Sequence, residues 1–115
     1  MAENLEIAMK KPVYEIGGKS YRLHYSIGRL EQIEQATGCS VMTAMVSMSE
    51  KKMMPLYMLK AYFAYGLMDD NGVFAPLKAA SEFVENQMQE NGYFSVMNAV
   101  TEQITEDCGF LFRGV

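Results

Sequence analysis

The sequence contains little histidine, cysteine or proline, and it has no tryptophan. Its 115 residues include one histidine, two cysteines and three prolines. A single histidine leaves little scope for imidazole-based catalysis, and two cysteines are too few for a disulfide scaffold. A reducing compartment is therefore the simpler inference for this chain.

Positive charge is also scarce, with ten lysines and arginines against fourteen aspartates and glutamates. The net charge of −4 is unevenly spread, because residues 1–68 carry +2 and residues 69–115 carry −6. Nucleic-acid binders need clustered lysine and arginine to contact phosphates. The charge balance therefore predicts no nucleic-acid partner and an acidic surface in the second half.

Long apolar stretches are missing as well. The most apolar segment, residues 53–68, has 16 residues and contains Pro55 and Lys60, whereas a membrane span needs about 20. Residues 1–11 mix charged and apolar side chains, unlike a secretory signal. These features predict a cytoplasmic protein with no membrane partner.

Recognisable catalytic and metal-binding motifs are absent too, since there is no HExxH, CxxC, GxSxG or phosphate-loop pattern. His24 is expected on the polar face of a strand without an evident partner, which favours an exposed strand residue over a general base. The Asp-Asp-Asn-Gly segment at 69–72 lacks the first ligand and the closing glutamate of a calcium loop, so a plain turn is favoured. Cys39 and Cys108 are expected to be ordinary buried or half-buried thiols. The sequence thus predicts no enzyme activity, no cofactor and no bound metal.

Two short segments near the start have the composition of a β-hairpin. They cover residues 13–16 and 20–25, and between them lie Gly17 and Gly18, which suit a tight turn with positive φ. In the second segment apolar and polar side chains alternate, giving one face that must pack on something else. A hairpin over residues 13–25 is therefore expected.

Helical spacing of apolar residues dominates the rest of the chain. Helices are expected over about 26–37, 40–48, 54–68, 76–91 and 93–107. The third is apolar on both sides, which is typical of a helix buried centrally, with Leu59 and Phe63 near its middle. The predicted fold is α+β and mainly α: an N-terminal β-hairpin followed by a bundle of about four to five helices. It forms one domain, residues 13–115, after a flexible lead-in of residues 1–12.

Methionine is abundant, with eleven in the chain and seven of them within residues 42–68. Methionine is unbranched and polarizable, so it serves both as loose core filling and on binding surfaces that accept varied partners. A second apolar concentration lies at residues 110–112, and exposed apolar patches usually mark interaction sites. With core filling as the alternative, the candidate partner-binding residues are Met42, Met45, Met48, Met53, Met54, Phe110, Leu111 and Phe112.

Residues 14–41 read YEIGGKSYRLHYSIGRLEQIEQATGCSV. This segment resembles the opening of the tail assembly chaperones of long-tailed bacteriophages, a family also found in prophages and gene transfer agents. That family has a Gly-Lys turn, a strand reading Tyr-x-Leu-x-aromatic, and a helix with a Leu-x-x-Ile/Leu-Glu core that ends at glycine. The matching positions here are Gly18, Lys19, Tyr21, Leu23, Tyr25, Leu30, Ile33, Glu34 and Gly38. The rest of the chain matches only in kind, as helices of suitable length.

The resemblance implies a non-enzymatic chaperone that coats the tape measure protein, helps recruit tail tube subunits and is absent from the finished virion. It implies action in the cytoplasm of the bacterial host, and it supplies no catalytic residues and no fixed partner-binding motif. The residues themselves independently indicate an acidic, mainly helical, methionine-rich binder, for which self-association is a further option. Two other interpretations stay open: a structural phage protein, such as a tail completion or head-tail connector protein, and a small regulatory protein.

Overall fold

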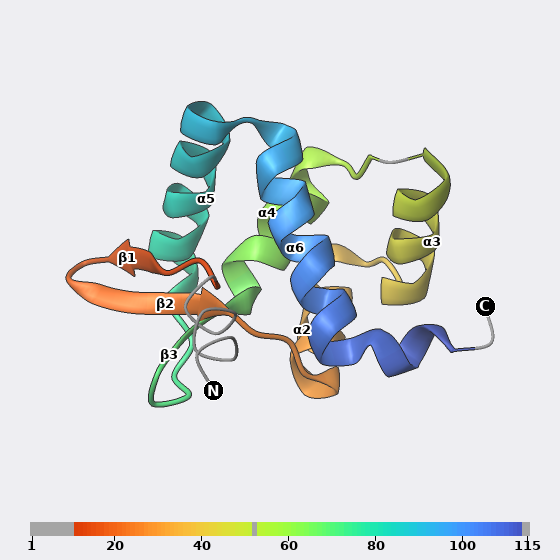
Figure 1. Ribbon diagram of the computed structural model, residues 1–115, viewed down its shortest axis with the longest axis horizontal. Coiled ribbons are helices and arrows are strands. Elements are labelled where there is room, and N and C mark those ends of the chain that lie inside the picture. The colour runs from red at the N-terminus through yellow and green to blue at the C-terminus, as the bar shows by residue number, and fades with distance from the viewer. Residues whose placement is uncertain (1–10, 52, 114–115) are drawn as a thin grey trace, which may run out of the picture.

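A computed structural model of the chain describes residues 11–51 and 53–113 (Figure 1). This part of the chain folds into a three-stranded antiparallel sheet and five α-helices, followed by a short 3-10 helix. The predicted fold class, α+β and mainly α, is confirmed. The predicted flexible lead-in over residues 1–12 lies outside the described residues, except for Lys11 and Pro12.

The predicted hairpin is present and consists of β1 (Tyr14–Ile16) and β2 (Lys19–Leu23). The two residues of its turn, Gly17 and Gly18, have φ angles of 58° and 82°. Positive φ at both central positions is the backbone of the turn that matches the twist of paired strands. The local turn chemistry therefore fixes which residues pair.

Replacing Gly18 by valine is expected to lower the free energy of unfolding by about 1–2 kcal/mol, because a β-branched side chain is strained at positive φ. No atom lies within 4 Å of the position a β-carbon would take there, so the loss would come from the backbone alone. Gly18→Asn should lose less, since asparagine tolerates this conformation. Equal stability of the Gly18→Val variant in urea denaturation would show that the turn does not need this backbone.

A third strand, β3 (Leu67–Asp69), pairs antiparallel with β2 and was not predicted. In its register Leu23 lies opposite Leu67. The helix predicted over 54–68 therefore ends early, and α4 spans Leu56–Gly66. The prediction of helix failed for residues 67–68 because the apolar spacing continues beyond the end of α4. Their conformation is decided by pairing with β2, a strand more than forty residues earlier in the chain.

The turn predicted at 69–72 follows β3. The Asp69 carboxylate oxygen Oδ1 accepts hydrogen bonds from the backbone N–H groups of Asn71 and Val73, each at 2.9 Å. Gly72 has a φ of 81°. The Asp69 side chain thus satisfies backbone groups of its own turn, as aspartate commonly does.

The remaining helices follow the predicted order: α2 (Ile27–Thr37), α3 (Val41–Lys51), α5 (Leu77–Asn91) and α6 (Tyr93–Cys108). Both ends of α2 are capped, because Ser26 Oγ accepts a hydrogen bond from the Arg29 N–H at 3.2 Å and Gly38 ends the helix with a φ of 73°. Helix α6 ends at Cys108 with Gly109 as its C-cap, and Gly109 is also the first residue of the 3-10 helix η1 (Gly109–Phe112). The chain therefore continues in helical form to the end of its apolar segment.

Helix α4 lies at the centre of the fold and packs against α2, α5 and α6 (Figure 1). Leu59 and Phe63 are buried with exposed fractions of 0% and 1%, as predicted. The Phe63 ring also packs edge-to-face with the Tyr14 ring, with the two ring centroids 5.1 Å apart. This contact joins the hairpin to the helices. The prediction that α4 is buried all round is wrong for its first turn, because Leu56 and Tyr57 are exposed.

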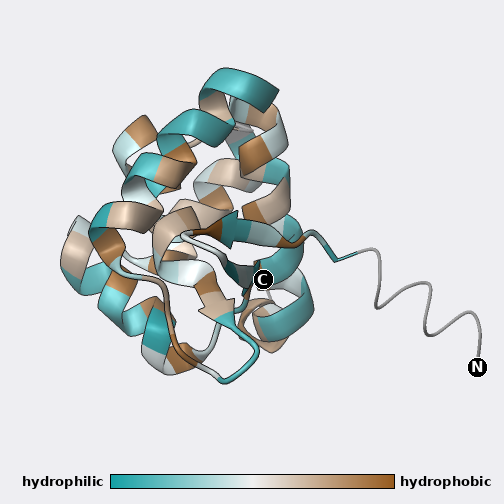
Figure 2. Cartoon of the chain, turned by 90° about the vertical axis from the view of Figure 1, so that its left-hand side faces the viewer, coloured by the Kyte–Doolittle hydropathy of each residue, from teal (hydrophilic) through white to brown (hydrophobic). Residues whose placement is uncertain are grey.

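Viewed from the side of α5, hydrophilic and hydrophobic residues alternate around the helices (Figure 2). Such a distribution lets each helix bury one face and leave the other in water. Across the described ranges no helix combines the length and the apolar character that crossing a membrane requires.

Candidate functional site

The eight predicted partner-binding residues occupy two neighbouring parts of the structure. Met42 and Met45 are half-buried on α3, and Met53 is exposed in the segment that follows it. At the other end, η1 carries Phe110, which is exposed, and then Leu111 and Phe112, which are half-buried. These two segments are separated by about sixty residues in sequence but lie beside one another in the fold.

A groove of about 630 Å³ runs between α3 and the end of α6 with η1, here called the α3–α6 groove. Its lining residues are Met45, Val46, Met48, Ser49, Glu50, Thr101, Thr105, Gly109 and Phe112. Three of the predicted residues, from both segments, therefore line one concave surface. Figure 1 shows α3 standing beside the end of α6 and η1.

The chemistry of the α3–α6 groove is simple. Methionine, valine and phenylalanine side chains supply its apolar part, and serine and threonine side chains supply hydroxyl groups. Glu50 is the one charged residue among those that line it. Apolar surface with a few polar groups is the usual composition of a binding site.

Met48 and Met54 were predicted on the binding surface, but the structure places both in the core. Their exposed fractions are 9% and 5%. Met48 shares the inward face of α3 with Val41 and Ala44, at helical spacing. For these two residues core filling, the alternative interpretation, fits the structure better, and Met48 contributes only its remaining exposed edge to the groove.

The burial of Met54 has a specific cause. The Tyr93 hydroxyl accepts a hydrogen bond from the Met54 backbone N–H and donates one to the Met54 carbonyl oxygen. One side chain at the start of α6 therefore satisfies both backbone groups of a residue between α3 and α4. Unpaired backbone groups are costly when buried, so these bonds hold the segment against α6.

Sequence reasoning missed three exposed apolar residues near this segment, namely Leu56, Tyr57 and Phe94. Leu56 and Tyr57 were assigned to a helix buried on all sides, and Phe94 was not singled out. The sequence did contain a sign of their exposure. All three lie in the first turn of a helix, within two residues of the Pro55 or Gly92 that precedes it. The first turn of a helix often projects past the elements that cover its middle, so apolar periodicity alone does not establish burial there.

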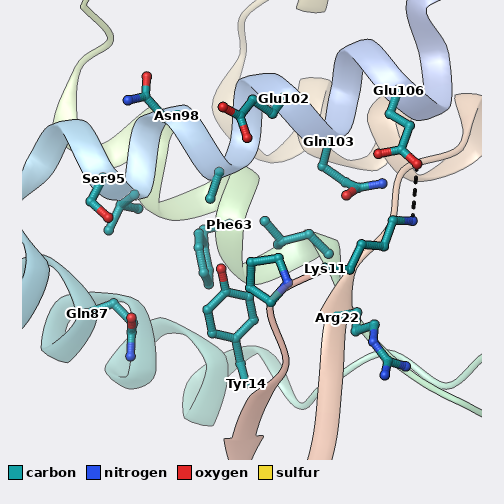
Figure 3. A pocket seen from close by; sticks show the side chains of 14 residues that line it. Lys11, Tyr14, Arg22, Phe63, Gln87, Ser95, Asn98, Glu102, Gln103 and Glu106 are labelled. Atoms are coloured by element: carbon teal, nitrogen blue, oxygen red, sulfur yellow. Dashed lines mark ion pairs between the residues drawn. The ribbon is translucent and has the colours of Figure 1, made fainter. Parts of the chain in front are cut away.

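A second concavity, of about 600 Å³, lies between the hairpin and α6 (Figure 3). Tyr14, Leu23 and Phe63 supply apolar surface, and polar side chains of α5 and α6 surround it. Both cationic residues that line it have partners, because Lys11 Nζ lies 3.6 Å from Glu106 Oε1 and Arg22 Nη1 donates to Asp70 Oδ1 at 2.9 Å. None of the predicted partner-binding residues lines this pocket.

Asp107 joins the end of α6 to the segment that follows β2. Its carboxylate oxygen Oδ2 accepts hydrogen bonds from the Tyr25 backbone N–H at 2.9 Å and from Gln103 Nε2 at 3.0 Å. The same oxygen lies 3.6 Å from Nδ1 of His24. His24 was expected to be an exposed strand residue without an evident partner; its side chain is 45% exposed, but it lies just after β2 and has Asp107 as a neighbour. Because the Asp107 carboxylate bonds to a backbone N–H group, its role is structural: it connects the segment after β2 to α6.

The two cysteines are free thiols, as predicted, with Cys108 buried and Cys39 half-buried. Burial raises the pKa of the Cys108 thiol, and the nearby Asp107 carboxylate raises it further. A raised pKa keeps the thiol protonated and poorly nucleophilic. Cys108 therefore fits the predicted role of an ordinary core residue.

Within residues 11–51 and 53–113, no group of three or more histidine, cysteine, aspartate or glutamate side chains is arranged to hold a metal ion. The candidate site is therefore the α3–α6 groove, whose chemistry is that of a surface for apolar side chains. Comparison of the chain with protein-family models, with curated proteins and with solved structures finds no match.

Proposed function

We propose that this protein is a non-enzymatic chaperone that holds an apolar helical segment of a partner protein in the α3–α6 groove. One observation carries the proposal: two apolar segments, far apart in sequence, form opposite sides of the same groove. Met45 contributes from α3 and Phe112 from η1. Such an arrangement presents apolar side chains to a partner without exposing the core.

A helix suits this groove better than an extended segment. Recognition of an extended strand relies on unpaired backbone groups at a sheet edge, whereas helices insert apolar side chains into grooves. The groove here lies between helices and not at the edge of the sheet. Methionine in the lining adapts to different partner side chains, which suits a chaperone that binds many successive segments of one long partner.

The resemblance of residues 14–41 to tail assembly chaperones indicates which protein would be the partner. On that basis the helical segment belongs to a phage tape measure protein, the tail tube protein is a second partner, and assembly takes place in the bacterial cytoplasm. Mass spectrometry of purified phage particles tests this part. Absence of the chain from finished particles supports a chaperone, and its presence in fixed copy number supports a structural tail protein instead.

The groove itself is tested by replacing Met45 and Phe112 together with glutamine. Both side chains are half-buried, and full burial at an interface contributes up to about 1.5–3 kcal/mol each. The double variant should therefore bind a tape measure protein at least about tenfold more weakly in calorimetry, with little change in melting temperature. Met48 stays unchanged because it is buried.

Met88→Gln is the matched control, since Met88 is also half-buried but lies on α5, away from the groove. It should retain full affinity. Unchanged binding by the double variant would exclude the groove as the binding site. A collapsed melting temperature would instead assign Met45 and Phe112 to the core.

A further inference from the structure

Two threonine hydroxyls that line the α3–α6 groove donate their protons to the backbone of their own helix. The Thr101 hydroxyl donates to the carbonyl oxygens of Met97 and Asn98, at 3.1 Å and 3.2 Å. The Thr105 hydroxyl donates to the Thr101 carbonyl oxygen at 2.8 Å. A hydroxyl group has a single proton to donate, and its lone pairs can accept. Both threonines therefore present only hydrogen-bond acceptors to the groove.

The opposite wall of the groove adds a carboxylate. Glu50 lines the groove near the end of α3 and is exposed. An ionised carboxylate accepts hydrogen bonds and donates none. Among the side chains that the structure describes, no lysine, arginine or histidine lines the groove. Apart from Ser49, the polar side chains of the groove are therefore acceptors, and the charge among them is negative.

Lysine and arginine are the side chains that complement such a lining. Their ammonium and guanidinium groups donate hydrogen bonds and accept none. A glutamate of the partner would meet the Glu50 carboxylate with like charge, and a glutamine would bring an acceptor along with its donors. Hydrogen bonds between ionised groups are also stronger than those between neutral ones. The chemistry of the groove thus favours a basic residue of the partner over a neutral or acidic one.

The apolar and acidic parts of the groove are separated along α3. Met45 and Glu50 are five residues apart on this helix, which corresponds to about 7.5 Å along its axis. Phe112 belongs to η1, which lies nearer to the start of α3 than to its end (Figure 1). A partner helix lying along α3 covers this separation with residues four or five apart, and residues four apart share one face. An apolar residue and a basic residue one turn away would therefore reach both parts of the groove together.

We propose that Glu50 is a specificity-determining residue of the α3–α6 groove, which selects partner helices that carry lysine or arginine one turn from an apolar anchor. The inference rests on the proposed function, since it names the kind of helix that the groove holds. Apolar contacts with Met45 and Phe112 supply most of the affinity, and Glu50 discriminates between helices. Charged groups at the edge of an interface commonly contribute specificity in this way.

Three synthetic helical peptides of about 20 residues test the inference, because shorter isolated helices are marginal in water. The peptides share one leucine stripe and differ at a single position, four residues after the central leucine, which is lysine, glutamine or glutamate. In calorimetry the lysine peptide should bind the full chain about three to five times more tightly than the glutamine peptide, as expected for an exposed ion pair. The glutamate peptide should bind more weakly than either, and added salt should narrow these differences.

Glu50→Gln should lower the affinity for the lysine peptide to that for the glutamine peptide. Its melting temperature should not fall, because Glu50 is exposed and a negative charge near a helix C-terminus is not favoured. Glu90→Gln is the matched control. Glu90 is also exposed and also the second-last residue of its helix, but it lies on α5, away from the groove. This variant makes the same change in net charge and should keep the full preference for lysine.

The outcomes separate this inference from the proposed function. Equal binding of the three peptides, an unchanged preference in Glu50→Gln, or an equal loss in Glu90→Gln would each overturn the role of Glu50 and leave the proposed function standing. Failure of all three peptides to bind would overturn both, because the groove would then hold no helix. The double variant of Met45 and Phe112 should weaken all three peptides by the same factor, which separates the apolar contribution from the discrimination by charge.

Discussion

Replacing Leu59 by alanine is expected to lower the free energy of unfolding by about 2–5 kcal/mol. Leu59 is fully buried in α4, and this helix is covered by α2, α5 and α6. The change removes apolar contacts and leaves a cavity that rigid neighbours cannot fully close. Urea denaturation followed by circular dichroism measures the loss.

Leu56→Ala is the matched control, because it makes the same change three residues earlier in the same helix at an exposed position. Its effect on the free energy of unfolding should stay within about 0.5 kcal/mol. If Leu59→Ala cost no more than Leu56→Ala, α4 would not be the centre of the core.

The second large effect is expected at Gly66, where α4 ends and the chain turns into β3. A β-carbon on this residue would lie 2.7 Å from both Cζ and Oη of Tyr25, closer than real contacts allow. The Tyr25 side chain is buried, and its hydroxyl donates to the Tyr62 carbonyl oxygen at 2.7 Å. Gly66→Ala should therefore cost about 2–5 kcal/mol, through overpacking and disturbance of this hydrogen bond.

Gly28→Ala provides the contrast, since Gly28 lies in α2 and no atom lies within 4 Å of the position its β-carbon would take. There alanine should stabilise the fold by about 0.5–1 kcal/mol through its higher helix propensity. A double variant of Gly66→Ala with Tyr25→Leu should lose less than the sum of the single losses, because the clash has been removed. Additive losses would show that the contact with Tyr25 is not the cause of the destabilisation.

Local chemistry made several parts of the fold predictable. The Gly17-Gly18 pair specifies its turn through backbone sterics alone, and Ser26 and Gly38 mark the ends of α2 by capping. These signals act between residues close in sequence, so no knowledge of the tertiary structure is needed to interpret them. The order of the helices and the burial of the middle of α4 follow from apolar periodicity in the same way.

The third strand shows where such local signals end. The residues of β3 continue the apolar spacing of α4, and their strand conformation depends on hydrogen bonds to β2. The sequence contains no local sign of that pairing. The close approach of Gly66 to Tyr25 is likewise a contact between distant segments. Glycine is common at helix ends in general, so its presence at this position does not by itself indicate a close neighbour.

The methionine-rich segment contains two kinds of residue that the sequence could not separate. Met45 and Met48 are three residues apart on α3, yet one is half-buried and the other is in the core. The difference depends on which side of α3 faces its neighbours. Composition predicts that apolar surface is present, but it does not say which part of that surface other elements cover.

The sequence by itself determined the fold class, the hairpin turn, the helix caps and the scarcity of catalytic groups, because each depends on residue type or on short spacing. Only the tertiary structure decided that η1 lies beside α3 to form a groove, and that the Tyr93 hydroxyl at the start of α6 contacts Met54 in the segment before α4. Both contacts join segments about forty to sixty residues apart. Their contact is set by the packing of the whole core, which no local pattern encodes.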